Sequence, residues 1–365
     1  MVLLLRCLAL VVSLAAALAA AGFAAEAETL HIQTLDGPDS IATTGLQKLA
    51  DDLRIASGGE IDMVVLPVRS AVGPTATLEM MAAGAIDGHY SSPGYFAHLD
   101  PAFALLGDTL ALYPDPDRRD DWYADGGGLE IARDLYDAHG AHLVGFVYWP
   151  EEWLVSANPA SILADLSGRD IRAPGGPVSD LLGRIGVNPV VLSGEDTLAR
   201  LQRGSLDAAD WATLPANLAA GVHADAPYAI RARHSMPVTE LSISKTAWER
   251  LSPSSRRLLE NRVALFSRTQ RAAFNAADAS ARAAARGQGV TLLEMSRSSQ
   301  SDLRDAALAV FEERGDASEA AGRIAASHRA FLEKHGLAKP AAPKAPEAAN
   351  PEPDAPETPE IGGSG

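Results

Sequence analysis

The sequence predicts an α/β protein with two lobes. Three observations point to this fold class: short β-like runs alternate with helical stretches, the chain is long enough for two lobes, and one uninterrupted helical stretch near its end can reach across both. Alternating strands and helices are typical of α/β proteins with mainly parallel sheets. At 365 residues, of which 47% are hydrophobic, the chain can bury an ordinary core.

The alternation begins near the N-terminus and continues through most of the chain. Period-two runs rich in β-branched residues indicate strands, and longer runs with helical periodicity indicate helices. The expected strands lie at residues 30–34, 61–67, 142–148, 170–173, 189–192 and 239–244, with helices at residues 42–57 and 76–83.

The long helical stretch covers residues 254–286, which contain no Pro or Gly. It has about 33 residues and would be roughly 50 Å long. A helix of this length can brace two lobes at once. The alternative is a coiled-coil arm, but apolar positions such as Leu259, Val263 and Phe274 do not keep a sustained heptad.

The N-terminal segment has the pattern of a signal peptide. Arg6 precedes an apolar run from Leu8 to Ala21, and small residues follow it. The run is shorter than a membrane-spanning helix requires, which disfavours a membrane anchor. We expect a signal peptide within residues 1–27, cut so that the mature chain starts near Gly22 or near Glu28, and we expect the protein to act in the periplasm.

The remaining chain divides into two lobes and a tail. We expect a first lobe from residues 28–147 together with about 238–337, and a second lobe from residues 148–237. From residue 338 to residue 365, the sequence is dominated by Pro, Ala and Glu and offers little to bury. This composition predicts a disordered tail.

Composition excludes several classes of function. The single cysteine, Cys7, lies in the predicted signal peptide, so cysteine nucleophiles, cysteine metal sites and disulfides are excluded from the mature chain. The formal net charge of −16 would repel nucleic acid and anionic lipid. An anionic ligand would therefore need a local positive group, which makes individual arginines candidates for binding.

Arg172 is the first candidate. It lies at the end of the strand at residues 170–173, directly before a Pro-Gly-Gly turn and a helix. Open α/β sheets bind ligands at this edge, and the planar guanidinium can donate two parallel hydrogen bonds to one carboxylate. The alternative is an arginine in a surface ion pair. Its position alone supports ligand binding and a surface ion pair equally.

Two further groups of residues combine carboxylates with tryptophans. Asp210 and Trp211 are adjacent, and could be a ligand acceptor and a pocket wall, or a structural cap and a core residue. Glu151 and Glu152 lie between Trp149 and Trp153, and one of the two acids could bind a cation. They cannot share one task if successive side chains point to opposite sides.

The segment around Tyr90 and Ser91 follows a short strand and could present two hydroxyls to a cleft. The alternative is a turn with an exposed hydroxyl. Trp149 is a further, weaker candidate for the same cleft.

The order of several segments resembles a known family. Glu151 is followed by the strand ending in Ile171-Arg172, then by residues 191–195 with the sequence Val-Leu-Ser-Gly-Glu, and then by residues 201–211. This order resembles the DctP-type solute-binding proteins of tripartite ATP-independent periplasmic (TRAP) transporters, in the branch that binds 2-oxo acids and related monocarboxylates. The resemblance covers residues 29–337 and implies a two-lobed, periplasmic-binding-protein type II-like fold with a long bracing helix.

The resemblance also implies roles for single residues. The family's arginine at the end of this strand holds the substrate carboxylate, and it matches Arg172. In the 2-oxo acid branch, a cation such as Na⁺ or Ca²⁺ bridges substrate and protein through positions that match Glu151, Asp210 and the backbone of Trp211. A further acid of that site matches Glu240, with His234 as the competing position.

This sequence departs from the family at two of these positions. Glu151 replaces an amide, and Asp210 is one carbon shorter than the expected glutamate. Either the added charge favours a divalent ion such as calcium, or the site holds no metal.

The implied function is a receptor that captures a small carboxylic acid, with a 2-oxo or 2-hydroxy monocarboxylate favoured, and delivers it to the membrane subunits of a TRAP transporter. We expect no enzymatic activity, no organic cofactor and no nucleic-acid partner, and a monomer or homodimer. The alternatives are a periplasmic metal-dependent enzyme and a ligand receptor for a sensor. The sequence lacks a nucleophile elbow and a histidine-rich metal motif, which argues against the enzyme.

Overall fold

The computed structural model describes residues 27–339. The predicted signal peptide at residues 1–27 and the predicted tail at residues 338–365 therefore lie almost wholly outside the described residues. Within this described part, none of the helices is long and apolar enough to cross a membrane.

The first sheet, with the helices packed on it, forms lobe I. Among the described residues it has five strands in the order β2-β1-β3-β10-β4. β1 pairs in parallel with β2 and β3, whereas β10 runs antiparallel to both β3 and β4. The strands are β1 (Glu28–Gln33), β2 (Ile61–Leu66), β3 (Gly88–Ser91), β4 (Ala141–Val147) and β10 (Thr239–Ser244).

The second sheet forms lobe II, and its order is β11-β9-β5-β8-β6-β7. β5 runs antiparallel to β8 and β9, and the other pairs are parallel. Its strands are β5 (Trp153–Ser156), β6 (Asp170–Ala173), β7 (Asn188–Val191), β8 (Ala208–Ala212), β9 (Tyr228–Arg231) and β11 (Thr291–Glu294). β11 thus belongs to the second sheet, although the sequence placed residues 238–337 in the first lobe.

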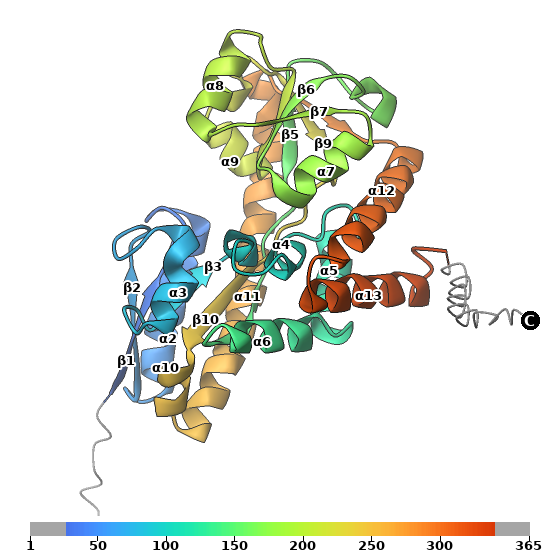
Figure 1. Cartoon of the computed structure of the whole chain (residues 1–365). Helices are drawn as coiled ribbons and strands as arrows, with labels where there is room; N and C mark the ends of the chain where they lie inside the picture. The colour runs from blue at the N-terminus through green and yellow to red at the C-terminus, as the bar shows by residue number, and fades with distance from the viewer. Residues whose placement is uncertain (1–26, 340–365) are drawn as a thin grey trace, which may run out of the picture.

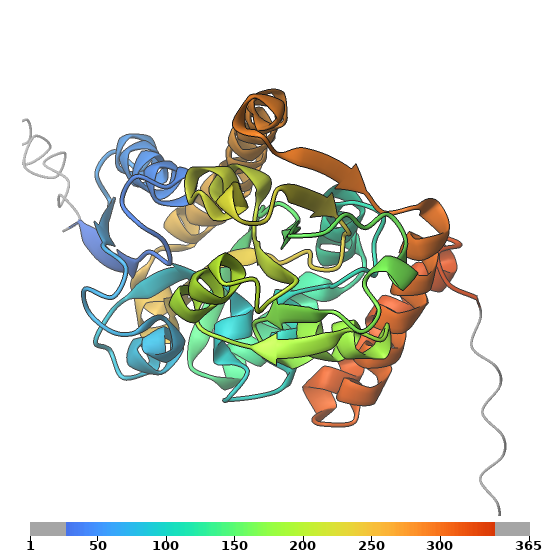
Figure 2. The ribbon, with the colours of Figure 1, turned by 90° about the horizontal axis from the view of Figure 1, so that it is seen from above.

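Helices cover both sheets and connect them. The C-terminal helices α12 and α13 lie on the side of the molecule away from β1 and β2 (Figures 1 and 2). The helices are α2 (Ile41–Ala56), α3 (Thr77–Ala82), α4 (Ala102–Gly107), α5 (Pro116–Asp125), α6 (Gly128–Ala138), α7 (Gly176–Arg184), α8 (Gly194–Gln202), α9 (Leu214–Ala219), α10 (Lys245–Arg250), α11 (Pro253–Ala285), α12 (Arg297–Gly315) and α13 (Glu319–Lys334).

The long helix α11 runs from lobe I to lobe II (Figure 1). Its first turn is fixed because the Ser252 side chain accepts a hydrogen bond from the backbone N–H of Ser255, and Pro253 occupies the first helical position. Its buried positions include Leu259, Val263 and Phe274. It packs on α2 and β4 in lobe I and on α9 and β11 in lobe II. The predicted two-lobed α/β fold with a bracing helix is therefore confirmed.

The chain also crosses between the sheets through two extended segments. We call residues 148–152, between β4 and β5, the first hinge segment, and residues 232–238, between β9 and β10, the second hinge segment. The backbone N–H of Glu152 donates to the carbonyl oxygen of Ser235 at 3.1 Å, which joins the two segments directly.

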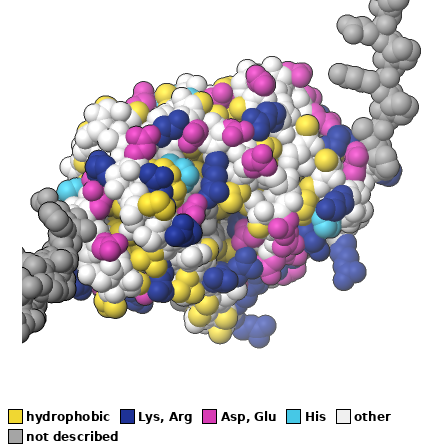
Figure 3. All heavy atoms as spheres, turned by 90° about the horizontal axis from the view of Figure 1, so that it is seen from below, with side chains coloured by type: hydrophobic (Ala, Val, Ile, Leu, Met, Phe, Trp, Pro, Cys, Tyr) yellow, Lys and Arg dark blue, Asp and Glu magenta, His cyan; other side chains and the backbone are white. Residues whose placement is uncertain are grey.

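Charged side chains of both signs are mixed on the lower face of the molecule (Figure 3). Ion pairs also join different elements at the surface, such as Arg250 with Glu28 at 2.5 Å and with Asp87 at 2.9 Å. The excess of acidic residues is therefore not concentrated into a uniformly acidic surface on this side.

Candidate ligand site between the lobes

A cavity of about 620 Å³ lies between the two lobes. Its lining includes Tyr95 and Asp108 from lobe I, Arg172 and Asp210 from lobe II, and Trp149 from the first hinge segment. Ligand pockets for small molecules typically occupy about 300–1,000 Å³. A cavity shared by two lobes and their hinge can bind a small molecule and respond to it by closing.

Arg172 reaches this cavity from the C-terminal end of β6, beside the start of α7. Its Nη1 donates to the carbonyl oxygen of Asp210 at 2.6 Å, and its Nε donates to that of Leu192 at 3.3 Å. Its guanidinium carbon lies 5.7 Å from the ring centroid of Trp211. Within residues 27–339, Nη2 has no hydrogen-bond acceptor. The guanidinium is therefore held in orientation and keeps donor capacity for a ligand.

Three carboxyl groups line the same cavity, from Asp108, Glu152 and Asp210. The hydroxyl oxygen of Ser235 lies 2.7 Å from Asp108 Oδ2 and 3.1 Å from Glu152 Oε2. On the other side, His234 Nε2 lies 2.9 Å from Asp210 Oδ1, and both side chains are buried. The backbone N–H groups of Leu110 and Met236 donate to Asp108 at 2.7 and 2.9 Å.

These carboxyl groups differ in their affinity for a proton. Burial raises the pKa of Glu152 well above its usual value, and the charges of Asp210 and Asp108 raise it further. Burial also acts to raise the pKa of Asp210, but the charge and hydrogen bond of His234 and the hydrogen bond with Glu152 lower it below the usual value. Burial also raises the pKa of Asp108. Glu152 and Asp108 therefore hold a proton more readily than an ordinary carboxyl group does, and Asp210 less readily.

Aromatic rings form the apolar part of the cavity. Trp149 packs edge-on against Phe274 of α11, with 5.1 Å between ring centroids. Trp211 lies beneath Arg172, and Tyr95 enters from the short 3-10 helix after β3 (Pro93–Phe96). Arg172, Asp210, Trp211 and Trp149, all proposed from the sequence, thus come together at one cavity.

The structure places Glu151 away from this cavity. Glu151 Oε1 lies 2.5 Å from Arg231 Nε, and its Oε2 lies 3.7 Å from Arg233 Nε. Glu152, the next residue, lines the cavity instead. This placement corrects the assignment of Glu151 to the ligand site. Neighbouring side chains of an extended segment point to different sides, so Glu152 faces the cavity and Glu151 does not.

Two other candidates, Tyr90 and Ser91, also lie elsewhere. The hydroxyl of Tyr90 is buried in lobe I, where it accepts a hydrogen bond from Thr239 Oγ1 at 3.1 Å. Ser91 is buried on β3, opposite Glu240, and its neighbour Ser92 lines the cavity. These side chains belong to the interior of the first sheet, and their assignment to the ligand site is corrected.

Glu240 is buried in the same sheet. Its Oε1 lies 2.9 Å from His89 Nε2, and Ser242 Oγ donates to its Oε2 at 2.6 Å. The proposed metal ligands Glu151, Asp210, Trp211 and Glu240 are therefore not gathered at one point. Within the described part of the chain, no group of three His, Asp or Glu side chains has an arrangement suited to a metal ion.

Sequence reasoning did not assign Asp108, Tyr95 or Ser235 to the site. Asp108 follows α4 in sequence, and it reaches the cavity because it pairs with Pro237 in an isolated bridge. A bridge between residues so far apart leaves no local signal. Glu152 did leave a signal in the sequence. Because successive side chains alternate in direction, only one of Glu151 and Glu152 could face the cavity.

Comparisons with known proteins agree with this architecture. The family model described as DctP, bacterial extracellular solute-binding protein, family 7, matches residues 33–316. A monocarboxylate 2-oxoacid-binding periplasmic protein of a Nostoc species is 25% identical over 189 residues, which are 49% of this chain and 49% of that protein. The match thus spans about half the length of this curated relative.

Two solved structures are also similar. A TRAP periplasmic solute-binding protein of Rhodobacter sphaeroides, in an open form without ligand, is 28% identical with a TM-score of 0.77, over 85% of this chain and 99% of that chain. A TRAP solute-binding protein of Bordetella bronchiseptica RB50, with copurified calcium and picolinate at one active site, is 19% identical with a TM-score of 0.71, over 85% of this chain and 93% of that chain. With a family model that matches most of its length, this chain belongs to the DctP family of bacterial extracellular solute-binding proteins.

Proposed function

We propose that the protein is a periplasmic receptor that captures a small carboxylic acid between its lobes and delivers it to the membrane subunits of a TRAP transporter. The observation that carries this proposal is Arg172, whose guanidinium is oriented by two backbone carbonyls at the wall of the interlobe cavity. An oriented guanidinium is the side chain best suited to bind one carboxylate through parallel hydrogen bonds.

The opposite side of the cavity favours an acid that carries a second oxygen near its carboxylate. A protonated Glu152 can donate a hydrogen bond to an oxo or hydroxyl oxygen, and an ionised Asp210 can accept one from a hydroxyl. This pair suits 2-oxo and 2-hydroxy monocarboxylates. The Nostoc relative is a 2-oxoacid-binding protein, which supports the same class.

A bridging cation fits these residues less well than a proton does. The Bordetella neighbour copurified with calcium. In this chain, however, the oxygens of Asp108 already accept from Leu110, Met236 and Ser235, and Asp210 is bonded to His234. A proton on Glu152 also relieves the repulsion among the carboxyl groups. We therefore propose that the ligand binds without a bridging metal ion.

A thermal-shift screen of small oxo, hydroxy and dicarboxylic acids, with and without EDTA, tests the proposal. A ligand at a hundredfold excess over Kd stabilises the folded state by about 2.7 kcal/mol. We expect stabilisation by a 2-oxo or 2-hydroxy monocarboxylate that EDTA does not remove. Loss of the shift in EDTA would show that a cation takes part, and turnover of the acid would favour an enzyme instead.

A further inference from the structure

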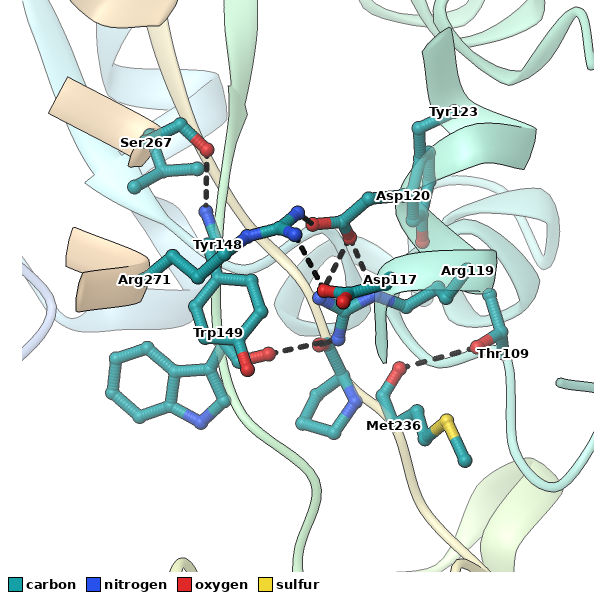
Figure 4. A network of polar contacts seen from close by, with 12 residues as sticks. Thr109, Asp117, Arg119, Asp120, Tyr123, Tyr148, Trp149, Met236, Ser267 and Arg271 are labelled. Atoms are coloured by element: carbon teal, nitrogen blue, oxygen red, sulfur yellow. Dashed lines mark hydrogen bonds and ion pairs between the residues drawn. The ribbon is translucent and has the colours of Figure 1, made fainter. Parts of the chain in front are cut away.

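Both hinge segments meet at one side chain, that of Arg119 on α5. Arg119 is fully buried. Its Nη1 donates to the carbonyl oxygen of Trp149 at 2.8 Å and to that of Pro237 at 2.5 Å (Figure 4). Trp149 lies in the first hinge segment and Pro237 in the second. One guanidinium therefore holds the backbones of both segments.

Arg119 is held in place from its other side by Asp120. Asp120 Oδ1 lies 2.9 Å from Arg119 Nε and 2.7 Å from Arg119 Nη2. The second oxygen of Asp120 accepts from Arg271 Nη2 of α11 at 2.5 Å. Burial acts to lower the pKa of Arg119, but the charge of Asp120 raises it. The guanidinium keeps its charge and is linked through Asp120 to the bracing helix.

Tyr148, at the start of the first hinge segment, packs against both arginines. Its ring centroid lies 5.5 Å from the Arg119 guanidinium carbon and 4.9 Å from that of Arg271 (Figure 4). Its backbone N–H donates to Ser267 Oγ of α11 at 2.9 Å. The first hinge segment is therefore fixed to α5 and to α11 at the residue before Trp149.

The two carbonyls that Arg119 binds belong to residues of the ligand cavity, since both Trp149 and Pro237 line it. We propose that Arg119 is a positioning residue that keeps the two hinge segments in register and so sets the walls of the cavity for ligand binding. It reaches the site only through the backbones of these two residues. Its effect on affinity rests on the proposed function, whereas its effect on the hinge does not.

Arg271 offers a matched control. Like Arg119, it bonds to Asp120 and packs on Tyr148, and it also pairs with Asp117. Among residues 27–339, Arg271 makes no hydrogen bond to the carbonyl oxygen of Trp149 or of Pro237. Arg119→Met and Arg271→Met therefore remove the same charge from the same network, but only the first leaves the two hinge carbonyls without this donor.

Amide hydrogen exchange of the full chain without ligand tests the hinge directly. In Arg119→Met, we expect exchange in residues 148–152 and 232–238 to increase at least tenfold, while exchange in β1 changes little. In Arg271→Met, which loses the contact with Tyr148 but keeps both hinge carbonyls bonded to Arg119, we expect a much smaller increase in exchange of the hinge segments. A general loss of stability would raise exchange in β1 as well. Equal effects of the two substitutions, or none from Arg119→Met, would overturn the proposal.

Arg119→Lys covers the case in which Arg119→Met does not fold. Lysine keeps the positive charge beside Asp120 but lacks the planar fork that serves Asp120 and both carbonyls together. We expect hinge exchange faster than in the wild type at unchanged global stability. Wild-type exchange in a folded Arg119→Lys would contradict the proposal.

Binding of pyruvate and lactate, measured by isothermal titration, gives the second readout. We expect Kd to rise about tenfold in Arg119→Lys and to stay within twofold in Arg271→Met. If the wild type binds neither acid, this substrate assignment fails while the exchange result still decides the role of Arg119. If both acids bind and Arg119→Lys leaves Kd unchanged, Arg119 does not position the cavity.

Discussion

Glu151 and Glu152 are neighbours in the first hinge segment, and their carboxyl groups have different partners. Glu151 Oε1 lies 2.5 Å from Arg231 Nε, whereas Glu152 lines the cavity with Asp210 and lies 3.1 Å from the hydroxyl of Ser235. One residue of separation thus divides a structural ion pair from the ligand site. Substituting each in turn tests the two carboxyl groups separately.

We predict that Glu151→Gln destabilises the protein without changing which acid it prefers. The substitution removes a buried charge from Arg231, which keeps only the longer contact with Glu294 at 3.4 Å. Loss of a charge-assisted hydrogen bond costs about 1.5–3 kcal/mol. Urea unfolding should show this loss in the free energy of unfolding. A changed order of affinities in an acid panel, at unchanged stability, would return Glu151 to the binding site.

Glu152→Gln should alter the pH dependence of stability. Because the pKa of Glu152 is raised in the folded state, the folded wild type binds its proton more tightly than the unfolded chain does. This contribution to stability is fully present below the usual carboxyl range and is lost as the pH rises through the raised pKa. Glutamine does not titrate, so the variant should lose less stability toward alkaline pH. Thermal unfolding from pH 5 to pH 9 tests this, and parallel curves would contradict it.

Arg172→Ala should weaken binding of the preferred acid by at least a hundredfold. Two charge-assisted hydrogen bonds of about 1.5–3 kcal/mol each are lost with the guanidinium, and tenfold in Kd corresponds to about 1.4 kcal/mol. Arg169→Ala is the matched control, because Arg169 precedes the same strand but bonds to Asn158 and Pro159 on the outside. Isothermal titration of both variants measures the difference, and equal losses would remove the special role of Arg172.

Much of the fold was predictable because it is encoded locally. The strand at residues 170–173 and the helix from about residue 254 follow from hydrophobic periodicity and the absence of Pro and Gly, and the structure has them as β6 and α11. The role of Arg172 could be predicted from the sequence for the same reason, since the end of a parallel strand before a glycine-rich turn is a recurrent ligand position.

The rest of the site depends on contacts between distant parts of the chain. Asp108 enters the cavity through its bridge to Pro237, and His234 reaches Asp210 across the second hinge segment. Tyr90 and Glu240 look like site residues in sequence, but they face the interior of lobe I because β10 pairs with β3 there. Side-chain direction in such short strands follows from register, which the sequence does not reveal.

The central claim is that the interlobe cavity binds one small carboxylic acid through Arg172. Isothermal titration of the wild type with pyruvate and lactate, with the acid recovered and quantified afterwards, tests it most directly. We predict saturable binding of one acid per chain, with the acid recovered unchanged. Absence of binding to any acid of the screening panel at millimolar concentration, or consumption of the acid, would contradict the account.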